Sequence, residues 1–168
     1  MVKLIKYLVI IAALCVAGVF IWKHFFGKSE VEIIKEQIYS LASEASKKAG
    51  ESIPSAIIHA KTVENFFTDP CYINVGTQMF SGKYSQIQIG ASCMRYRQMF
   101  KQIKFTAHDL EVNLTGTGTA TAFLTAELRG ITRSGRNINA FRELECSFVF
   151  HKDKWLISKV NIRRIIEK

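Results

Sequence analysis

The stretch that decides the fold is Arg142–Ile162, RELECSFVFHKDKWLISKVNI. Apolar side chains recur at every second position in both halves of this stretch, which is typical of strands that bury one face. The alternating residues are Leu144, Cys146, Phe148 and Phe150, then Trp155 and Ile157, then Val160 and Ile162. The polar pair Lys152-Asp153 separates the two halves and predicts a tight turn. The stretch therefore predicts a β-hairpin with one buried face.

The same alternation continues upstream of this hairpin. Leu110–Leu114 and Ala120–Leu128 each place apolar residues at every second position. Glycines mark the connections between the alternating runs, at Gly116 with Gly118 and at Gly130 with Gly135. The C-terminal half thus predicts a four-stranded antiparallel meander.

The preceding part of the chain has helical periodicity. Ser29–Ala49 places Ile34, Ile38 and Leu41 on one side, and Gly50 ends that helix. Further elements are a helix capped by Ser52 and ended by Asp69-Pro70, a short strand Cys71–Val75, and a third helix Tyr84–Ile103. Helices followed by a meander predict an α+β domain, with three helices packed on a curved antiparallel sheet.

The first 28 residues predict a membrane anchor. Tyr7–Trp22 contains no charge, and Leu4–Phe26 is long enough to cross a hydrocarbon core of about 30 Å as a transmembrane helix. A cleaved signal peptide is the alternative, but the apolar run closes on Trp22 and Lys23 rather than on a small-residue cleavage site. We therefore expect an anchor over residues 1–28 and one domain over residues 29–168.

Charges flank the predicted anchor on both sides, with Lys3 and Lys6 before it and Lys23 and Lys28 after it. The N-terminal segment is too short to fold by itself, which favours its staying in the cytoplasm. The expected topology is a single-pass protein of the cell inner membrane, with its domain on the extracytoplasmic side.

Charge and cysteine content limit the classes of partner. The part from Ser29 to Lys168 contains 19 Lys and Arg residues and 14 Asp and Glu residues, so it carries +5 of the formal net charge of +9. The basic residues are scattered, which argues against a nucleic-acid partner. Cys71, Cys93 and Cys146 form no CxxC or Cys/His motif, so we expect no metal site and no cofactor. Two alternatives remain for these cysteines, which are three buried thiols or one disulfide bridge such as Cys71–Cys93.

The order of these elements, with Lys154–Ile157 (KWLI) opening the last strand, resembles the nuclear transport factor 2-like (SnoaL-like) fold superfamily. The resemblance covers Val31–Ile166. It implies a cone between the curved sheet and the helices, in which family enzymes use Asp, His or Tyr for proton transfer. Its members include dehydratases, isomerases, ligand carriers and non-catalytic assembly modules, so the fold does not choose the function.

Arg142 is the leading candidate for a ligand-binding residue, because it shares the alternation of Leu144 and Cys146 and so points toward the cone. A guanidinium buried there needs either a carboxylate, for which Asp69 and Glu64 are candidates, or an anionic ligand. The alternative is that Arg142 lies at an exposed rim. The other candidate ligand-binding residues are Tyr72, Tyr96, Asp69 and His59.

These residues form no recognisable catalytic arrangement, so we assign no catalytic residue. The expected function is a membrane-anchored, non-enzymatic binding or assembly module that engages a protein partner or a small apolar or anionic ligand. A protein partner or a homodimer would use the sheet. A small-molecule dehydratase or isomerase that works in the cone is the alternative.

Overall fold

The computed structural model describes residues 28–74 and 81–166 of the chain. The chain divides into two compact units, Met1–Ile33 and Ile34–Lys168. The described part of the first unit contains the start of helix α2 (Glu30–Ala45). There the Ser29 hydroxyl accepts a hydrogen bond from the backbone N–H of Glu32, and the Glu32 carboxylate accepts one from the backbone N–H of Ser29. The predicted anchor, Leu4–Phe26, lies outside the described residues. Within those residues no helix is both long and apolar enough to span a membrane.

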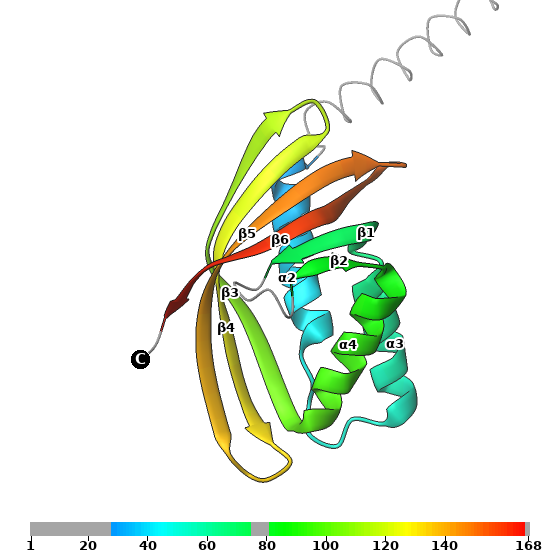
Figure 1. Ribbon diagram of the computed structural model, residues 1–168, viewed down its shortest axis with the longest axis vertical. Coiled ribbons are helices and arrows are strands. Elements are labelled where there is room, and N and C mark those ends of the chain that lie inside the picture. The colour runs from blue at the N-terminus through cyan, green and yellow to red at the C-terminus, as the bar shows by residue number, and fades with distance from the viewer. Residues whose placement is uncertain (1–27, 75–80, 167–168) are drawn as a thin grey trace, which may run out of the picture. The chain divides into compact units, whose positions relative to one another are not determined.

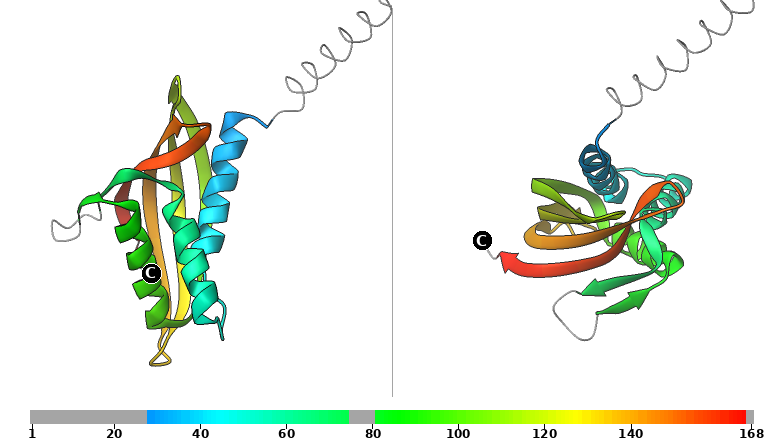
Figure 2. Two further views of the ribbon diagram at one scale, coloured as in Figure 1. Left: turned by 90° about the vertical axis from the view of Figure 1, so that its right-hand side faces the viewer. Right: turned by 90° about the horizontal axis from the view of Figure 1, so that it is seen from above.

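The second unit is an α+β domain in which three helices lie on one face of a curved sheet (Figure 1, Figure 2). The sheet has six strands in the order β2-β1-β6-β5-β4-β3. After α2 the elements are α3 (Ile53–Glu64), β1 (Phe67–Asn74), β2 (Gly82–Tyr84), α4 (Gln86–Met99), β3 (Phe100–Gly116), β4 (Thr119–Thr132), β5 (Asn137–His151) and β6 (Lys154–Ile166). The predicted α+β class and the antiparallel meander of β3 to β6 are confirmed.

The prediction of a purely antiparallel sheet is wrong, because β1 pairs with β6 in parallel. Strand β1 returns from α3 beside the last strand of the chain, where Tyr72 lies opposite Lys159 and Ile73 opposite Val160. Strand β2 then pairs with β1 in antiparallel orientation. The sheet is therefore mixed, and β2 and β3 are its two edges.

All three predicted helices are shorter than expected. Helix α2 ends at Ala45 rather than at Ala49. Helix α3 ends at Glu64, and Asp69 and Pro70, joined by a cis peptide bond, lie inside β1 instead of terminating the helix. Helix α4 ends at Met99 rather than at Ile103, whose backbone exchanges two hydrogen bonds with Lys47 (2.7 and 3.0 Å). Residues 100–103 therefore pair as part of strand β3 instead of extending the helix.

The ends of the helices and the turns follow local chemistry. Ser85 and Gln88 form a capping box at the start of α4, and Ser52 caps α3. Gly118 adopts a positive φ of 70° in the turn between β3 and β4, which a residue without a Cβ tolerates best. Lys152 and Asp153 make the predicted turn between β5 and β6.

The core lies between the helices and the concave face of the sheet. Its least exposed side chains, which are less than 3% exposed, come from both layers. They include Ile34, Cys71, Ile103, Phe148, Trp155 and Ile157. The alternation predicted for β5 and β6 thus correctly identifies Cys146, Phe148, Trp155 and Ile157 as buried, but it is wrong for Phe150, which is 47% exposed.

Candidate functional site

An apolar pocket of about 240 Å³ lies between helix α2 and the concave face of the sheet. Strands β3, β4, β5 and β6 contribute to its lining, and the lining residues of β4 and β5 alternate along each strand, as the pleat of a sheet requires. The residues that line it are Ile38, Leu41, Ala42, Ala45, Phe105, Thr106, Ala107, Leu124, Ala126, Leu144, Cys146 and Ile157. The pocket lies between the sheet and a helix, which is where the family resemblance implies a cone.

Small side chains leave this space open. Ala107 and Ala126 are directly opposite each other in the β3–β4 pair, and Ala42 and Ala45 face them from α2. Larger residues at these positions would fill the volume, because protein interiors are otherwise close-packed. The pocket therefore results from four alanines that two layers bring together.

The ionisable group in the lining of this pocket is a thiol. Burial raises the pKa of Cys146 to about 12, so the group is neutral at physiological pH. A neutral buried thiol behaves as a small apolar side chain rather than as a nucleophile. Within the described part of the chain, no imidazole, carboxylate or amine lines this pocket.

Arg142 lies on the face of β5 that lines the pocket, next to the pocket itself. It is directly opposite Ala126 in the β4–β5 pair, and its Nη1 donates a hydrogen bond to the backbone carbonyl of Phe141 at 2.7 Å. Among residues 28–74 and 81–166, no carboxylate forms an ion pair with it. The two candidate partners lie elsewhere: Asp69 is exposed on β1, and Glu64 packs over Gly90 of α4.

Tyr96 is the one other candidate residue that the structure brings near Arg142. Burial raises the pKa of the Tyr96 hydroxyl, and the positive charge of Arg142 partly offsets this effect. The Tyr96 ring also packs on Phe100, with 5.2 Å between the ring centroids. The charge of Arg142 thus acts on the Tyr96 hydroxyl, and neither residue belongs to the lining of the apolar pocket.

Tyr72 and His59 lie in other places. The Tyr72 ring on β1 has the ammonium of Lys159 5.8 Å above its centroid. His59 on α3 joins an ionic cluster, in which its Nδ1 is 2.7 Å from Glu44 Oε2 and its Nε2 is 3.9 Å from Glu51 Oε1. His59 and Glu51 line a second hollow, of about 800 Å³, between the end of α2 and strand β3.

The centre of this ionic cluster is Arg97, which sequence reasoning missed. Its side chain is only 2% exposed and binds both carboxylate oxygens of Glu51. Its Nη1 donates to the backbone carbonyls of Glu44 (2.6 Å) and Ser46 (2.7 Å) at the end of α2. A signal existed in the sequence, since Ile89, Cys93 and Arg97 follow one another at four-residue steps on one helix face.

The opposite, convex face of the sheet carries paired charges. Glu127 lies between His108 (2.9 Å from Nε2) and Arg129, and these two neighbours leave it 4% exposed. A hydrogen bond from His108 lowers the pKa of the Glu127 carboxyl below its ordinary value, with a further contribution from Arg129. Arg163 pairs with Glu145 at 3.2 Å on the same face.

No group of three or more His, Cys, Asp or Glu side chains in the described ranges could hold a metal ion.

Comparison with solved structures identifies the architecture. No family model matches the chain, and no curated protein is similar to it in sequence. The type 2 hexachlorocyclohexane dehydrochlorinase LinA has a TM-score of 0.63 at 9% identity, over 80% of this chain and 86% of that protein. Aln2 from a Streptomyces species has a TM-score of 0.60 at 10% identity, over 79% and 88%.

A third similar structure is an uncharacterised protein with a cystatin-like fold from Caulobacter vibrioides. Its TM-score is 0.59 at 14% identity, over 81% of this chain and 89% of that protein. Similarities at this level of identity establish the fold alone, which is the nuclear transport factor 2-like (SnoaL-like) fold. Proteins with this fold include enzymes as well as proteins without an assigned activity.

Proposed function

We propose that this nuclear transport factor 2-like domain is a non-enzymatic binding module for a small amphipathic anion. The apolar part of the ligand occupies the pocket under α2, and its anionic group meets Arg142. The observation that carries the proposal is the apolar lining of that pocket. Arg142 supports it, because its strand neighbours Ala126 and Leu144 belong to the lining.

The energetics suit a ligand of moderate affinity. Burial of an alkyl tail of five carbons contributes about 4 kcal/mol, at about 0.8 kcal/mol per carbon. A hydrogen bond between a guanidinium and a carboxylate adds about 1.5–3 kcal/mol. The pocket therefore supplies most of the affinity, and Arg142 supplies the preference for an anion.

Hexanoate and hexanol test the two halves of the site separately. We expect Ala126→Leu, which fills the pocket, to weaken the binding of both ligands about tenfold or more. Arg142→Met should weaken the binding of hexanoate about tenfold and leave the binding of hexanol unchanged, because it removes one charge-assisted hydrogen bond. Isothermal titration calorimetry measures the dissociation constants, and thermal unfolding confirms that each variant is folded.

Two controls make this test specific. Ala91→Leu makes the same substitution at an exposed position of α4 and should change neither affinity. Acetate, which has the carboxylate without the tail, measures binding of the charge alone. Hexanoate affinity that survives both Ala126→Leu and Arg142→Met would refute the assignment of the ligand to this pocket.

The second candidate is a small-molecule dehydratase or isomerase. The observation that favours it is the pairing of His59 with Glu44, since a carboxylate can orient an imidazole for proton transfer. His59 of this pair lines the second hollow, whereas the family resemblance implied chemistry in the cone. Turnover of a substrate that His59→Gln abolishes without loss of hexanoate binding would favour this candidate.

Membrane attachment belongs to the same proposal. Residues 4–26 would anchor the protein in the cell inner membrane as a single pass, with the domain on the extracytoplasmic side. The support is the length of this apolar run, which as a helix at 1.5 Å per residue reaches about 34 Å, against about 30 Å for a hydrocarbon core.

Deletion of Met1–Gly27 tests the anchor. We expect the full chain to sediment with membranes after a high-salt wash, and the shortened chain to stay in the supernatant as a folded domain. Ultracentrifugation followed by circular dichroism of the supernatant measures both properties. Sedimentation of the shortened chain with salt-washed membranes would contradict a single anchor over residues 4–26.

A further inference from the structure

A basic hollow of about 730 Å³ lies at one end of the sheet, away from the apolar pocket. Strands β3, β4 and β5 form its floor, and residues 47–49 after α2 form one wall. Its charged lining residues are Lys47, Lys48, Lys104 and Arg129, and no Asp or Glu of the described chain lines it. This concentration of positive charge sets the hollow apart from the rest of the sheet.

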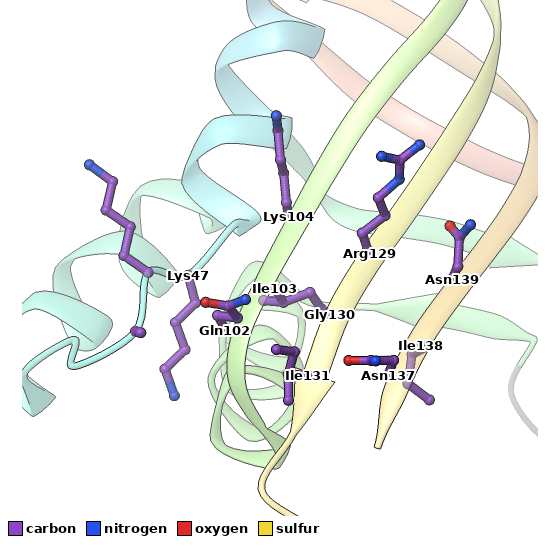
Figure 3. A pocket seen from close by; sticks show the side chains of 12 residues that line it. Lys47, Gln102, Ile103, Lys104, Arg129, Gly130, Ile131, Asn137, Ile138 and Asn139 are labelled. Carbon is purple, nitrogen blue, oxygen red and sulfur yellow. The ribbon is translucent and has the colours of Figure 1, made fainter. Parts of the chain in front are cut away.

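The strand register places the polar side chains of the floor in two rows. Lys104 lies opposite Arg129, which lies opposite Asn139, so the three point in one direction from adjacent strands (Figure 3). The next row runs in the same way through Gln102, Ile131 and Asn137. Two cations and three amides thus converge on one surface of the sheet.

The first row places two like charges directly opposite each other. Lys104 and Arg129 are directly opposite each other in an antiparallel pair, and like charges in that position destabilise a sheet. Arg129 has a carboxylate partner in Glu127, but Glu127 also binds His108. Within the described residues Lys104 and Lys48 form no ion pair. The local excess of positive charge is therefore not neutralised by the protein itself.

The donors that remain in the hollow match a tetrahedral dianion. Lys47 uses its ammonium on the backbone carbonyls of Arg97 (3.0 Å) and Phe100 (2.8 Å), so it contributes charge rather than a free donor. Lys104 and Lys48 offer ammonium groups, and Arg129 binds Glu127 through Nε, which leaves its terminal nitrogens. Asn139 adds an amide. Lysine, arginine and amide donors together are the usual ligands of phosphate oxygens.

We propose that this hollow binds a phosphoryl group, carried either by a small soluble molecule or by a phospholipid headgroup. The site is separate from the amphipathic-ligand pocket, because none of its lining residues belongs to that pocket. The phosphoryl-binding proposal can therefore be tested independently of the proposed function.

The experiment uses the full chain purified in a neutral detergent at pH 7.5. One arm titrates inorganic phosphate into the protein, and the other replaces part of the detergent with phosphatidylglycerol or, as the neutral reference, phosphatidylcholine. We expect Lys104→Gln and Lys48→Gln each to weaken phosphate or phosphatidylglycerol binding about tenfold. Arg129 is left unchanged, because its replacement would also release Glu127.

Lys83→Gln is the matched control, since Lys83 is an exposed lysine on β2, at the edge of the sheet opposite to β3. It should change the affinity less than twofold. Binding of free phosphate identifies a soluble ligand, and binding of phosphatidylglycerol alone identifies a lipid headgroup. Equal losses in Lys83→Gln and Lys104→Gln, or no binding in either arm, would overturn the proposal.

Discussion

Arg97→Met should lower the free energy of unfolding by about 3–5 kcal/mol, which is the cost of leaving one partner of a buried ion pair alone. The substitution leaves the Glu51 carboxylate, whose side chain is 7% exposed, without its cation. It also removes the hydrogen bonds that Arg97 donates to the backbone carbonyls of Glu44 and Ser46. Methionine retains most of the side-chain volume, so packing contributes little to the loss. Chemical denaturation of the domain measures the effect.

Two further variants make the Arg97 result interpretable. Arg95→Met makes the same change at an exposed position of the same helix and should cost less than about 0.5 kcal/mol. The double variant Arg97→Met with Glu51→Met should be more stable than Arg97→Met alone, because no charge is then left buried without a partner. A cost below about 1 kcal/mol for Arg97→Met would mean that water reaches the Glu51 carboxylate.

Trp155→Ala should cost about 3–5 kcal/mol, the usual range for the removal of a buried large aromatic side chain. Trp155 is 2% exposed on β6, and its ring packs against Phe150 with 5.4 Å between the centroids. Alanine in its place would leave a cavity at the start of the last strand, where the surrounding sheet cannot collapse to fill it. Thermal or urea unfolding of the domain measures the loss.

Phe150→Ala is the control for Trp155. It removes the other ring of the same contact, but Phe150 is 47% exposed, so the expected cost is less than half of that for Trp155. Equal costs for the two substitutions would show that the ring contact, rather than burial of Trp155, stabilises this hairpin. A cost below about 1 kcal/mol for Trp155→Ala would contradict the placement of Trp155 in the core.

The sequence by itself predicted the features that depend on near neighbours. The alternation of Leu144, Cys146 and Phe148 identified a strand and its buried face, and the same alternation placed Arg142 on the pocket side of β5. The Ser52 cap marked the start of α3, and Lys152-Asp153 marked the turn of the last hairpin. Such signals are readable because each depends on residues only a few positions apart.

The tertiary structure alone decided which distant segments meet. It placed β1 parallel to β6, ended α4 at Met99 through the pairing of Ile103 with Lys47, and buried Arg97 against Glu51. It also set Lys104 opposite Arg129. Local sequence patterns cannot specify these contacts, because their partners are separated by 25 to 90 positions in the chain and their energies exist only once the sheet has closed on the helices.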